Sequence, residues 1–182
     1  RILIEAEDHR NAYHPGVDPI GIVRAVWVYL KSGHIQGAST IEQQFVRVVT
    51  GSYKRSPARK LREQLLAIAV TRQRPKSSIA SAYLAIAFFG SGCVGLAGMK
   101  SHLGCRFHRT SAHEALRFVS QLKYPRPLQP DRYWYAKIHA RCDAIWSRRK
   151  LATNRSLQHV FKPNPTCSLE SANTSNTTYL ND

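Results

Sequence analysis

Apolar residues recur along the chain at every third or fourth position, the spacing of a helix face, and no segment alternates convincingly with the period of two that marks a strand. Ser or Asp residues in capping position precede several of these segments, and two are followed directly by Pro. The pattern predicts an all-α fold. The expected helices begin after Asp18 (ending near Gly33), at a capping box of Ser39 and Glu42, after Ser56, at about Ser77 (ending at Phe89), at a capping box of Ser111 and Glu114, and after Asp131.

The predicted helices carry apolar stripes, which we expect to form the core of one domain. Residues 90–98, GSGCVGLAG, lack the strand and the lysine of a phosphate loop, so we interpret them as a turn or a close helix contact. From residue 152 the chain is rich in Asn, Ser, Thr and Pro, which predicts a folded domain over 1–151 and a disordered polar tail over 152–182. The helix after Asp18 carries Ile20, Val23, Trp27 and Leu30 at helical spacing. The expected inward residues of the later helices are Ile41, Phe45, Val48 or Val49, then Leu61, Leu65 and Ile68, then Trp134, Ile138, Cys142 and Ile145.

The composition indicates what kind of partner the protein binds. Lys and Arg number 27 against 11 acids, so the chain favours an anionic partner: nucleic acid, anionic lipid or a pyrophosphate. No apolar run is long enough to cross a membrane, and no signal peptide is visible, so we expect any membrane anchor to lie outside this chain. The four cysteines form no C-x-x-C pair, and we expect no metal-ligand set.

Two acidic positions are candidates for chemistry. Glu7 and Asp8 are adjacent and cannot share a helix face, so they are expected to have separate roles. Spacing alone favours a simpler interpretation, a polar helix end followed by a turn. Glu63 follows Arg59 and Lys60 at helical spacing, which allows a carboxylate that is partly buried and still ionised. Helix geometry alone favours the other interpretation of Glu63, a solvated surface ion pair of little energetic value.

Three ordered motifs can be recognised. The first comprises Glu7, Asp8, His14, Gly16 and Asp18, the second Gly37, Ser39, Thr40, Ile41, Gln43 and Gln44, and the third Arg59, Lys60 and Glu63. With these motifs the chain resembles the peptidoglycan glycosyltransferase domain of penicillin-binding proteins and monofunctional transglycosylases. The match departs from the family at a few positions: Asn11 replaces a phenylalanine, Arg47 a lysine and Ala85 an asparagine, and His102-Leu103-Gly104 replaces a Tyr-Phe-Gly segment.

The resemblance implies that residues 1–151 are a catalytic domain, in which a lysozyme-like helical part lies beside a smaller membrane-apposed lobe. It also implies an inverting transfer that polymerises lipid II and releases undecaprenyl pyrophosphate, with Glu7 as general base and Glu63 as the second essential carboxylate. A divalent cation, Mg²⁺ or Mn²⁺, is plausible at the pyrophosphate, with Asp8 as a helper. The substrate-binding residues that the resemblance implies are Asp8, His14, Ser39, Thr40, Gln43, Gln44, Arg47, Arg59 and Lys60.

The implied partners are lipid II, the growing glycan strand, an anionic membrane surface and a cell-wall synthesis complex, at the extracytoplasmic face of a bacterial inner membrane. Nucleic acid is not expected, because the basic residues are spread along the chain. Three alternatives stay open: a lysozyme-type hydrolase, a basic helical nucleic-acid-binding module, and a decayed relative that binds lipid II without turning it over.

Overall fold

A computed structural model describes residues 1–54 and 56–160 of the chain, with residues 105, 106 and 152–160 described by their backbone alone. The chain divides into two units, Arg1–Trp146 and Ser147–Asp182. The described part of the second unit is helical, and everything that follows concerns the first unit unless stated otherwise.

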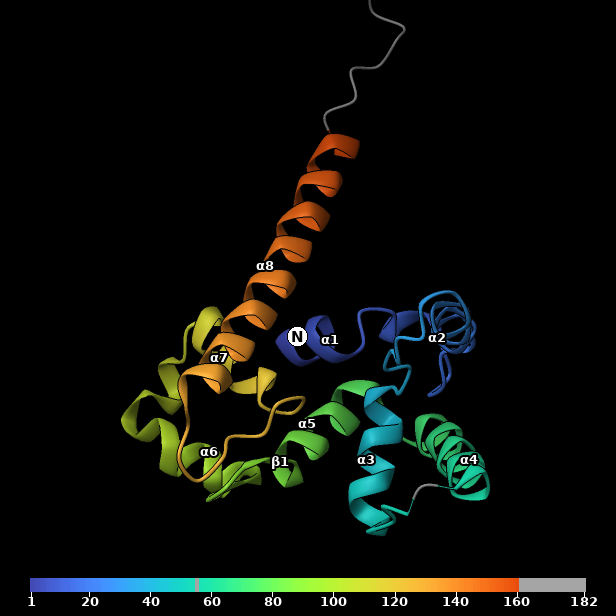
Figure 1. Ribbon diagram of the computed structural model, residues 1–182, viewed down its shortest axis with the longest axis horizontal. Coiled ribbons are helices and arrows are strands. Elements are labelled where there is room, and N and C mark those ends of the chain that lie inside the picture. The colour runs from blue at the N-terminus through green and yellow to red at the C-terminus, as the bar shows by residue number, and fades with distance from the viewer. Residues whose placement is uncertain (55, 161–182) are drawn as a thin grey trace, which may run out of the picture. The chain divides into compact units, whose positions relative to one another are not determined.

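Helices account for most of the described chain, which confirms the predicted all-α, lysozyme-like class (Figure 1). The elements are α1 (Ile2–Glu7), the 3-10 turn η1 (Asn11–Tyr13), α2 (Pro19–Ser32), α3 (Ile41–Thr50), α4 (Pro57–Gln73), α5 (Lys76–Ile86), β1 (Phe88–Gly90), β2 (Cys93–Val94), α6 (Gly95–Leu103), the 3-10 turn η2 (Gly104–Arg109), α7 (Ala112–Ser120) and α8 (Arg132–Val160).

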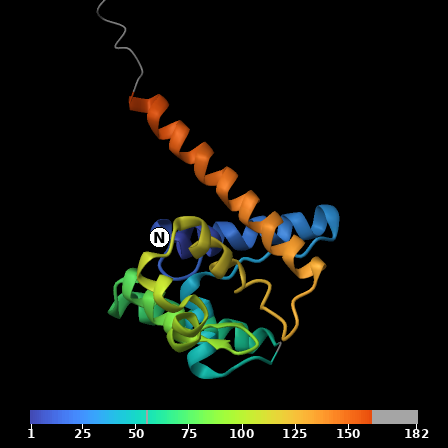
Figure 2. The ribbon, with the colours of Figure 1, turned by 90° about the vertical axis from the view of Figure 1, so that its left-hand side faces the viewer.

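The hydrophobic core gathers side chains from α1, α3, α5, β1, α7 and the first half of α8. Helix α1 lies against α7 (Figures 1 and 2), so the N-terminal end of the chain is packed into the middle of the unit. The predicted inward stripe of the last helix is confirmed, because Ile138, Cys142 and Ile145 are all buried. Neither α2 nor α4 contributes a residue to this core cluster.

Helix α4 presents to the protein the face opposite to the one predicted. Leu61 and Leu65 are 58% and 60% exposed, whereas Glu63 and Ala67 are buried. The predicted core stripe of this helix is therefore wrong at those two leucines. The physical reason is that α4 packs on α3 through small and charged residues whose charges are paired, which the apolar period alone does not reveal.

Helix α2 begins after Asp18 and ends at Gly33, as predicted, with Gly33 in the left-handed conformation that terminates helices (φ 67°). Its apolar stripe, Ile20, Val23, Trp27 and Leu30, faces outward and does not join the core, so the expectation that every predicted stripe forms the core is wrong for this helix. None of the described helices is both long enough and apolar enough to cross a bilayer. The exposed apolar residues of α2 are Ile20, Val23, Val26, Trp27, Tyr29 and Leu30.

Two predicted helix boundaries are corrected by tertiary contacts. The second helix begins one residue later than expected, with Thr40 as its N-cap, because Glu42 turns inward and does not complete a capping box with Ser39. The helix expected to reach Phe89 ends at Ile86. The residues of its expected last turn belong instead to β1, which pairs with β2 in a short hairpin. The two strands are too short to produce an alternating pattern in the sequence.

The glycine-rich segment fulfils the prediction of a turn and close contacts. Gly90 has φ 139°, and a Cβ there would lie 2.3 Å from the amide nitrogen of Arg126. Gly95 has φ 55°, and a Cβ would lie 2.1 Å from the carbonyl oxygen of Ala85. Only glycine allows the backbone to pass so closely at these two points.

Helix α8 continues to Val160, past the predicted start of the polar tail at residue 152. The segment 152–160 contains Ala, Arg, Leu and Gln and no Gly or Pro, so nothing in it stops a helix that has already formed. The rest of the predicted tail, 161–182, lies outside the described residues, and the domain boundary stays a prediction.

Candidate active site

Glu7 is the last residue of α1, and both of its carboxylate oxygens are engaged. Arg141 of α8 donates from Nη2 to Oε1 at 2.5 Å and also to the carbonyl oxygen of Ala6 at 3.3 Å. Gln44 of α3 donates from Nε2 to Oε2 at 3.2 Å. Three helices therefore meet at this carboxylate.

The amide of Gln44 is oriented by Tyr83 of α5, whose hydroxyl donates to Oε1 of Gln44 at 2.7 Å. Burial, and then the charge of Glu7, raise the pKa of Tyr83, so the phenol keeps its proton and remains a donor. Because the Gln44 oxygen faces Tyr83, its NH₂ group must face Glu7. The assignment of the amide is thus fixed by the neighbouring groups.

Glu63 of α4 lies among three cations and is only 4% exposed. Arg47 donates to it from Nε and Nη2, each at 3.0 Å, in the paired geometry that suits a guanidinium and a carboxylate. Lys60 Nζ lies 2.7 Å from Oε1, and Arg59 Nη1 donates to Oε2. Burial alone would raise the pKa of Glu63, but the hydrogen bonds from Arg47 and Lys60 outweigh it and lower the pKa to about 2. The solvated surface ion pair that helix geometry favoured is therefore wrong, because Arg47 of another helix joins Arg59 and Lys60 around a buried carboxylate.

The two acids contact the same face of α3. Glu7 bonds to Gln44 and Glu63 bonds to Arg47, and residues three apart on a helix lie on one face, about 4.5 Å apart along its axis. Helix α3 lies between the segments that carry the acids and contacts both α4 and α5 (Figure 1). This helix brings together two acids that belong to different motifs.

Lys60 joins the second motif to the third. Its Nζ donates to Ser39 Oγ at 3.1 Å, to Gln43 Oε1 at 3.0 Å and to Glu63 Oε1 at 2.7 Å. The first motif is joined to the second in a similar way, because Thr40 Oγ1 donates to the carbonyl oxygen of Gly16 at 2.6 Å. The three sequence motifs form one connected network.

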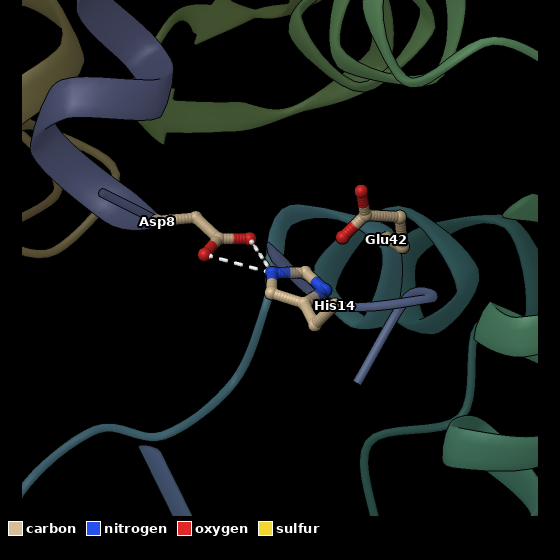
Figure 3. A group of neighbouring side chains, drawn as sticks. All are labelled: Asp8, His14 and Glu42. Atoms are coloured by element: carbon tan, nitrogen blue, oxygen red, sulfur yellow. Dashed lines mark hydrogen bonds and ion pairs between the residues drawn. The ribbon is translucent and has the colours of Figure 1, made fainter. Parts of the chain in front are cut away.

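Beneath this network lies a buried cluster of Asp8, His14 and Glu42 (Figure 3). His14 Nε2 lies 3.1 Å from each oxygen of Asp8. Asn11 Nδ2 donates to both acids, at 3.2 Å to Asp8 and at 2.9 Å to Glu42. The backbone amide of Ile41 also donates to Asp8, at 3.3 Å. Asn11, the departure from the family phenylalanine, is therefore a polar bridge between two buried carboxylates.

Lys76 supplies positive charge to this cluster. Its Nζ donates to the carbonyl oxygens of Asn11 and His14 and lies 3.7 Å from Glu42 Oε1. His14 Nδ1 faces two donors, the amide of Gly16 at 3.2 Å and Lys76 Nζ at 3.4 Å, so its ring proton is assigned to Nε2, toward Asp8.

A divalent ion does not fit this cluster, although its potential ligand atoms lie within 4.8 Å of one another. Both nitrogens of His14 already have hydrogen-bond partners, and the ammonium of Lys76 lies where it would repel a second cation. We therefore assign the cluster a structural role, in which it fixes the loop between α1 and α2 beneath Glu7.

The predicted site residues fall into two groups by exposure. Ser39, Gln44, Arg47, Arg59 and Lys60 are partly exposed, which leaves them accessible to a ligand. The remaining predicted binding residues are buried and bonded within the protein, and these are Asp8, His14, Thr40 and Gln43. The assignment of these four residues as substrate contacts stays a prediction.

Sequence reasoning missed Arg141. Cys142 and its apolar neighbours on α8 were recognised as core residues, but Arg141 belongs to no motif that we identified and has no acid at helical spacing that would suggest its partner. A cavity of about 280 Å³ opens beside Glu63 and is lined in part by Arg59, Arg62 and Tyr53. It provides space next to the cationic cluster.

Comparison with known proteins shows the family of the chain. Residues 1–150 match the family model described as transglycosylase, and the chain belongs to the transglycosylase family. It is 35% identical over 151 residues to penicillin-binding protein 1A of Rickettsia felis, which covers 80% of this chain and 19% of that protein. It is also 35% identical over 150 residues to penicillin-binding protein 1A of Escherichia coli strain K12, covering 81% of this chain and 18% of that protein. The chain thus spans about a fifth of the length of these relatives.

Proposed function

We propose that the chain is a peptidoglycan glycosyltransferase that polymerises lipid II into glycan strands. The reaction proceeds with inversion at the anomeric carbon and releases undecaprenyl pyrophosphate. The observation that carries this proposal is the convergence of Glu7 and Glu63 on one face of α3, through Gln44 and Arg47. Membership of the transglycosylase family supports it.

In this proposal Glu7 is the general base. An inverting transfer needs a base on the side of the sugar opposite to the leaving group, and a carboxylate at the end of α1 can accept the hydrogen of the acceptor 4-hydroxyl. Glu7 is held by donors from two helices, so its position is defined before substrate binds.

Glu63 has a different role because its oxygens are occupied by three cations and its pKa is about 2. A carboxylate this acidic is a poor base. It holds Arg47, Arg59 and Lys60 together in spite of their mutual repulsion. These cations then stabilise the negative charge that develops on the departing pyrophosphate. Both guanidiniums have donors beyond those used for Glu63 and can bind phosphate oxygens with them.

The outward apolar residues of α2 and of α4 support a membrane-apposed lobe. Val23 and Trp27 on α2 and Leu61 and Leu65 on α4 are all more than half exposed. Large apolar side chains in such numbers favour contact with an apolar phase, and Arg24 and Lys31 add attraction to anionic headgroups. We propose that this lobe rests on the membrane that holds the polyprenyl substrate.

A divalent cation at the pyrophosphate remains part of the proposal, but Asp8 is not assigned to hold it. Both Asp8 oxygens are engaged by His14, and one also by Asn11 and the Ile41 amide, in a buried position. Polymerisation measured with EDTA and then with added Mg²⁺ or Mn²⁺ tests the requirement.

The decisive experiment supplies lipid II in detergent to the wild-type chain and to Glu7→Gln, and measures glycan polymer. We expect polymer from the wild type and none from Glu7→Gln, because the amide keeps the shape of the side chain and loses its basicity. Glu5→Gln, which changes the other acid of α1, is the matched control and should remain active.

The same assay separates the alternatives. Soluble fragments released from finished peptidoglycan, without polymer from lipid II, would identify a hydrolase. Binding of lipid II without polymer would identify a decayed relative. Salt-sensitive retention of DNA at physiological ionic strength, with neither of those properties, would identify a nucleic-acid-binding module.

A further inference from the structure

Arg141 of α8 contacts the end of α1 that carries Glu7, although the two residues are far apart in the sequence. It lies 134 positions from Glu7 in the sequence, and their side chains are 13% and 12% exposed. Water is therefore largely excluded from the pair. A charge-assisted hydrogen bond in such surroundings holds its partner more strongly than one at the surface.

The guanidinium is attached to the backbone of α1 as well as to the Glu7 side chain. Ala6 is in the last turn of α1, where carbonyl oxygens lack helical partners, and Arg141 Nη2 donates to its carbonyl oxygen at 3.3 Å. The cation is thus positioned relative to the helix that carries Glu7. A lysine, with a compact ammonium on a flexible stem, would not be fixed in the same way.

The two oxygens of Glu7 consequently differ. Oε1 faces the guanidinium of Arg141, which does not give up a proton in the physiological pH range. Oε2 accepts one hydrogen bond from the neutral amide of Gln44, at the longer distance of 3.2 Å. A single neutral bond of this length is readily exchanged for a bond to an incoming hydroxyl.

We propose that Arg141 is a positioning residue for Glu7: it clamps Oε1 and so presents Oε2 as the atom that takes the hydrogen from the acceptor hydroxyl. This inference rests on the proposed function, in which Glu7 is the base. The O–H bond of the acceptor breaks and its hydrogen is bound by Oε2. The freed oxygen bonds to the anomeric carbon, and the bond from that carbon to the pyrophosphate oxygen breaks with its electron pair leaving on the pyrophosphate. Arg141 keeps its proton throughout.

The test compares lipid II polymerisation by the wild type, Arg141→Ala, Arg141→Lys and Arg132→Ala. Arg132 is an exposed arginine at the start of the same helix and serves as the matched control. We expect kcat of Arg141→Ala to fall about 100-fold, the cost of a misplaced reacting group. We expect KM to change little, because Arg141 holds the base and not the substrate. Arg132→Ala should behave as the wild type.

Chemical rescue separates positioning from a general loss of structure. Guanidinium ion added to Arg141→Ala should restore part of kcat, and Arg141→Lys should retain more activity than Arg141→Ala. Thermal unfolding of each variant shows whether it is folded in the assay. A kcat for folded Arg141→Ala within about threefold of the wild type overturns the inference and leaves the proposed function intact. An inactive wild type overturns the proposed function and this inference with it.

Discussion

Arg47 holds Glu63 through two parallel hydrogen bonds of 3.0 Å each, from a helix that precedes Glu63 in the sequence. Together with Arg59 and Lys60 it keeps a nearly inaccessible carboxylate ionised. The site is therefore built around a buried carboxylate that is ionised at neutral pH and paired with three cations. This arrangement has consequences for stability as well as for catalysis.

Stability at low pH should depend on Glu63. Its pKa is lowered from the ordinary 4.5 to about 2, so its contribution to folding is complete above pH 4.5 and is lost as the pH falls toward 2. We expect the free energy of unfolding of the wild type to fall through this interval and that of Glu63→Gln to fall less. Urea unfolding at a series of pH values measures both.

Glu5→Gln is a suitable comparison for this measurement, because Glu5 pairs with Arg1 at a much more exposed position. Its pH dependence should match that of the wild type. Identical acid profiles for wild type and Glu63→Gln would show that the three cations do not stabilise the ionised form.

Lys60→Ala should impair binding and turnover together. Its Nζ connects Ser39, Gln43 and Glu63, and in the proposed mechanism it also faces the departing pyrophosphate. We expect kcat/KM for lipid II to fall about 10- to 100-fold, the worth of one hydrogen bond to a charged group. Arg72→Ala, an exposed basic residue on the same helix, should have no effect. A fall in Arg72→Ala as large as in Lys60→Ala would point to overall charge as the cause.

The buried bridge made by Asn11 should be sensitive to charge. Asn11→Ala removes the donor shared by Asp8 and Glu42, and we expect a loss of about 1–3 kcal/mol of stability. Asn11→Asp should cost more, because it places a third carboxylate beside two buried ones. Chemical denaturation of the wild type and both variants measures the order of their free energies of unfolding. Equal stability of Asn11→Asp and wild type would mean that the bridge does not exist.

Filling the cavity beside Leu103 should stabilise the protein. The replacement of a family Tyr-Phe pair by His102 and Leu103 coincides with a cavity of about 270 Å³, which both residues line. We expect Leu103→Phe to gain about 1 kcal/mol of stability. Leu128→Phe, at a position that is 84% exposed, should change nothing. A lower melting temperature for Leu103→Phe would indicate that the larger ring does not fit.

The exposed face of α2 should govern attachment to lipid. We expect Trp27→Glu to reduce binding to vesicles that contain anionic lipid by at least about tenfold, since burying one large side chain is worth about 1.5–3 kcal/mol. Its melting temperature should be unchanged, because Trp27 is 58% exposed. Leu128→Glu is the control at an exposed position outside α2. Vesicle co-sedimentation measures the difference, and equal binding of both variants would rule out α2 as the contact.

Local sequence was sufficient to predict where most helices begin and which residue types carry the chemistry. Ser56 and Pro57 start α4, and Ser111 with Glu114 caps α7, because these signals act within one helical turn. The cationic neighbours of Glu63 on its own helix were equally evident, since residues three and four positions apart share a face.

Only the tertiary structure decided which of those faces is buried and which distant groups meet. The apolar period of α4 predicted that Leu61 would be buried, yet Glu63 is buried in its place because Arg47 comes from another helix to pair with it. The partnership of Glu7 with Arg141 likewise depends on how α8 packs beside α1. Helical spacing is a property of a few neighbouring residues, whereas the pairing of charges across helices is fixed by the packing of the whole core.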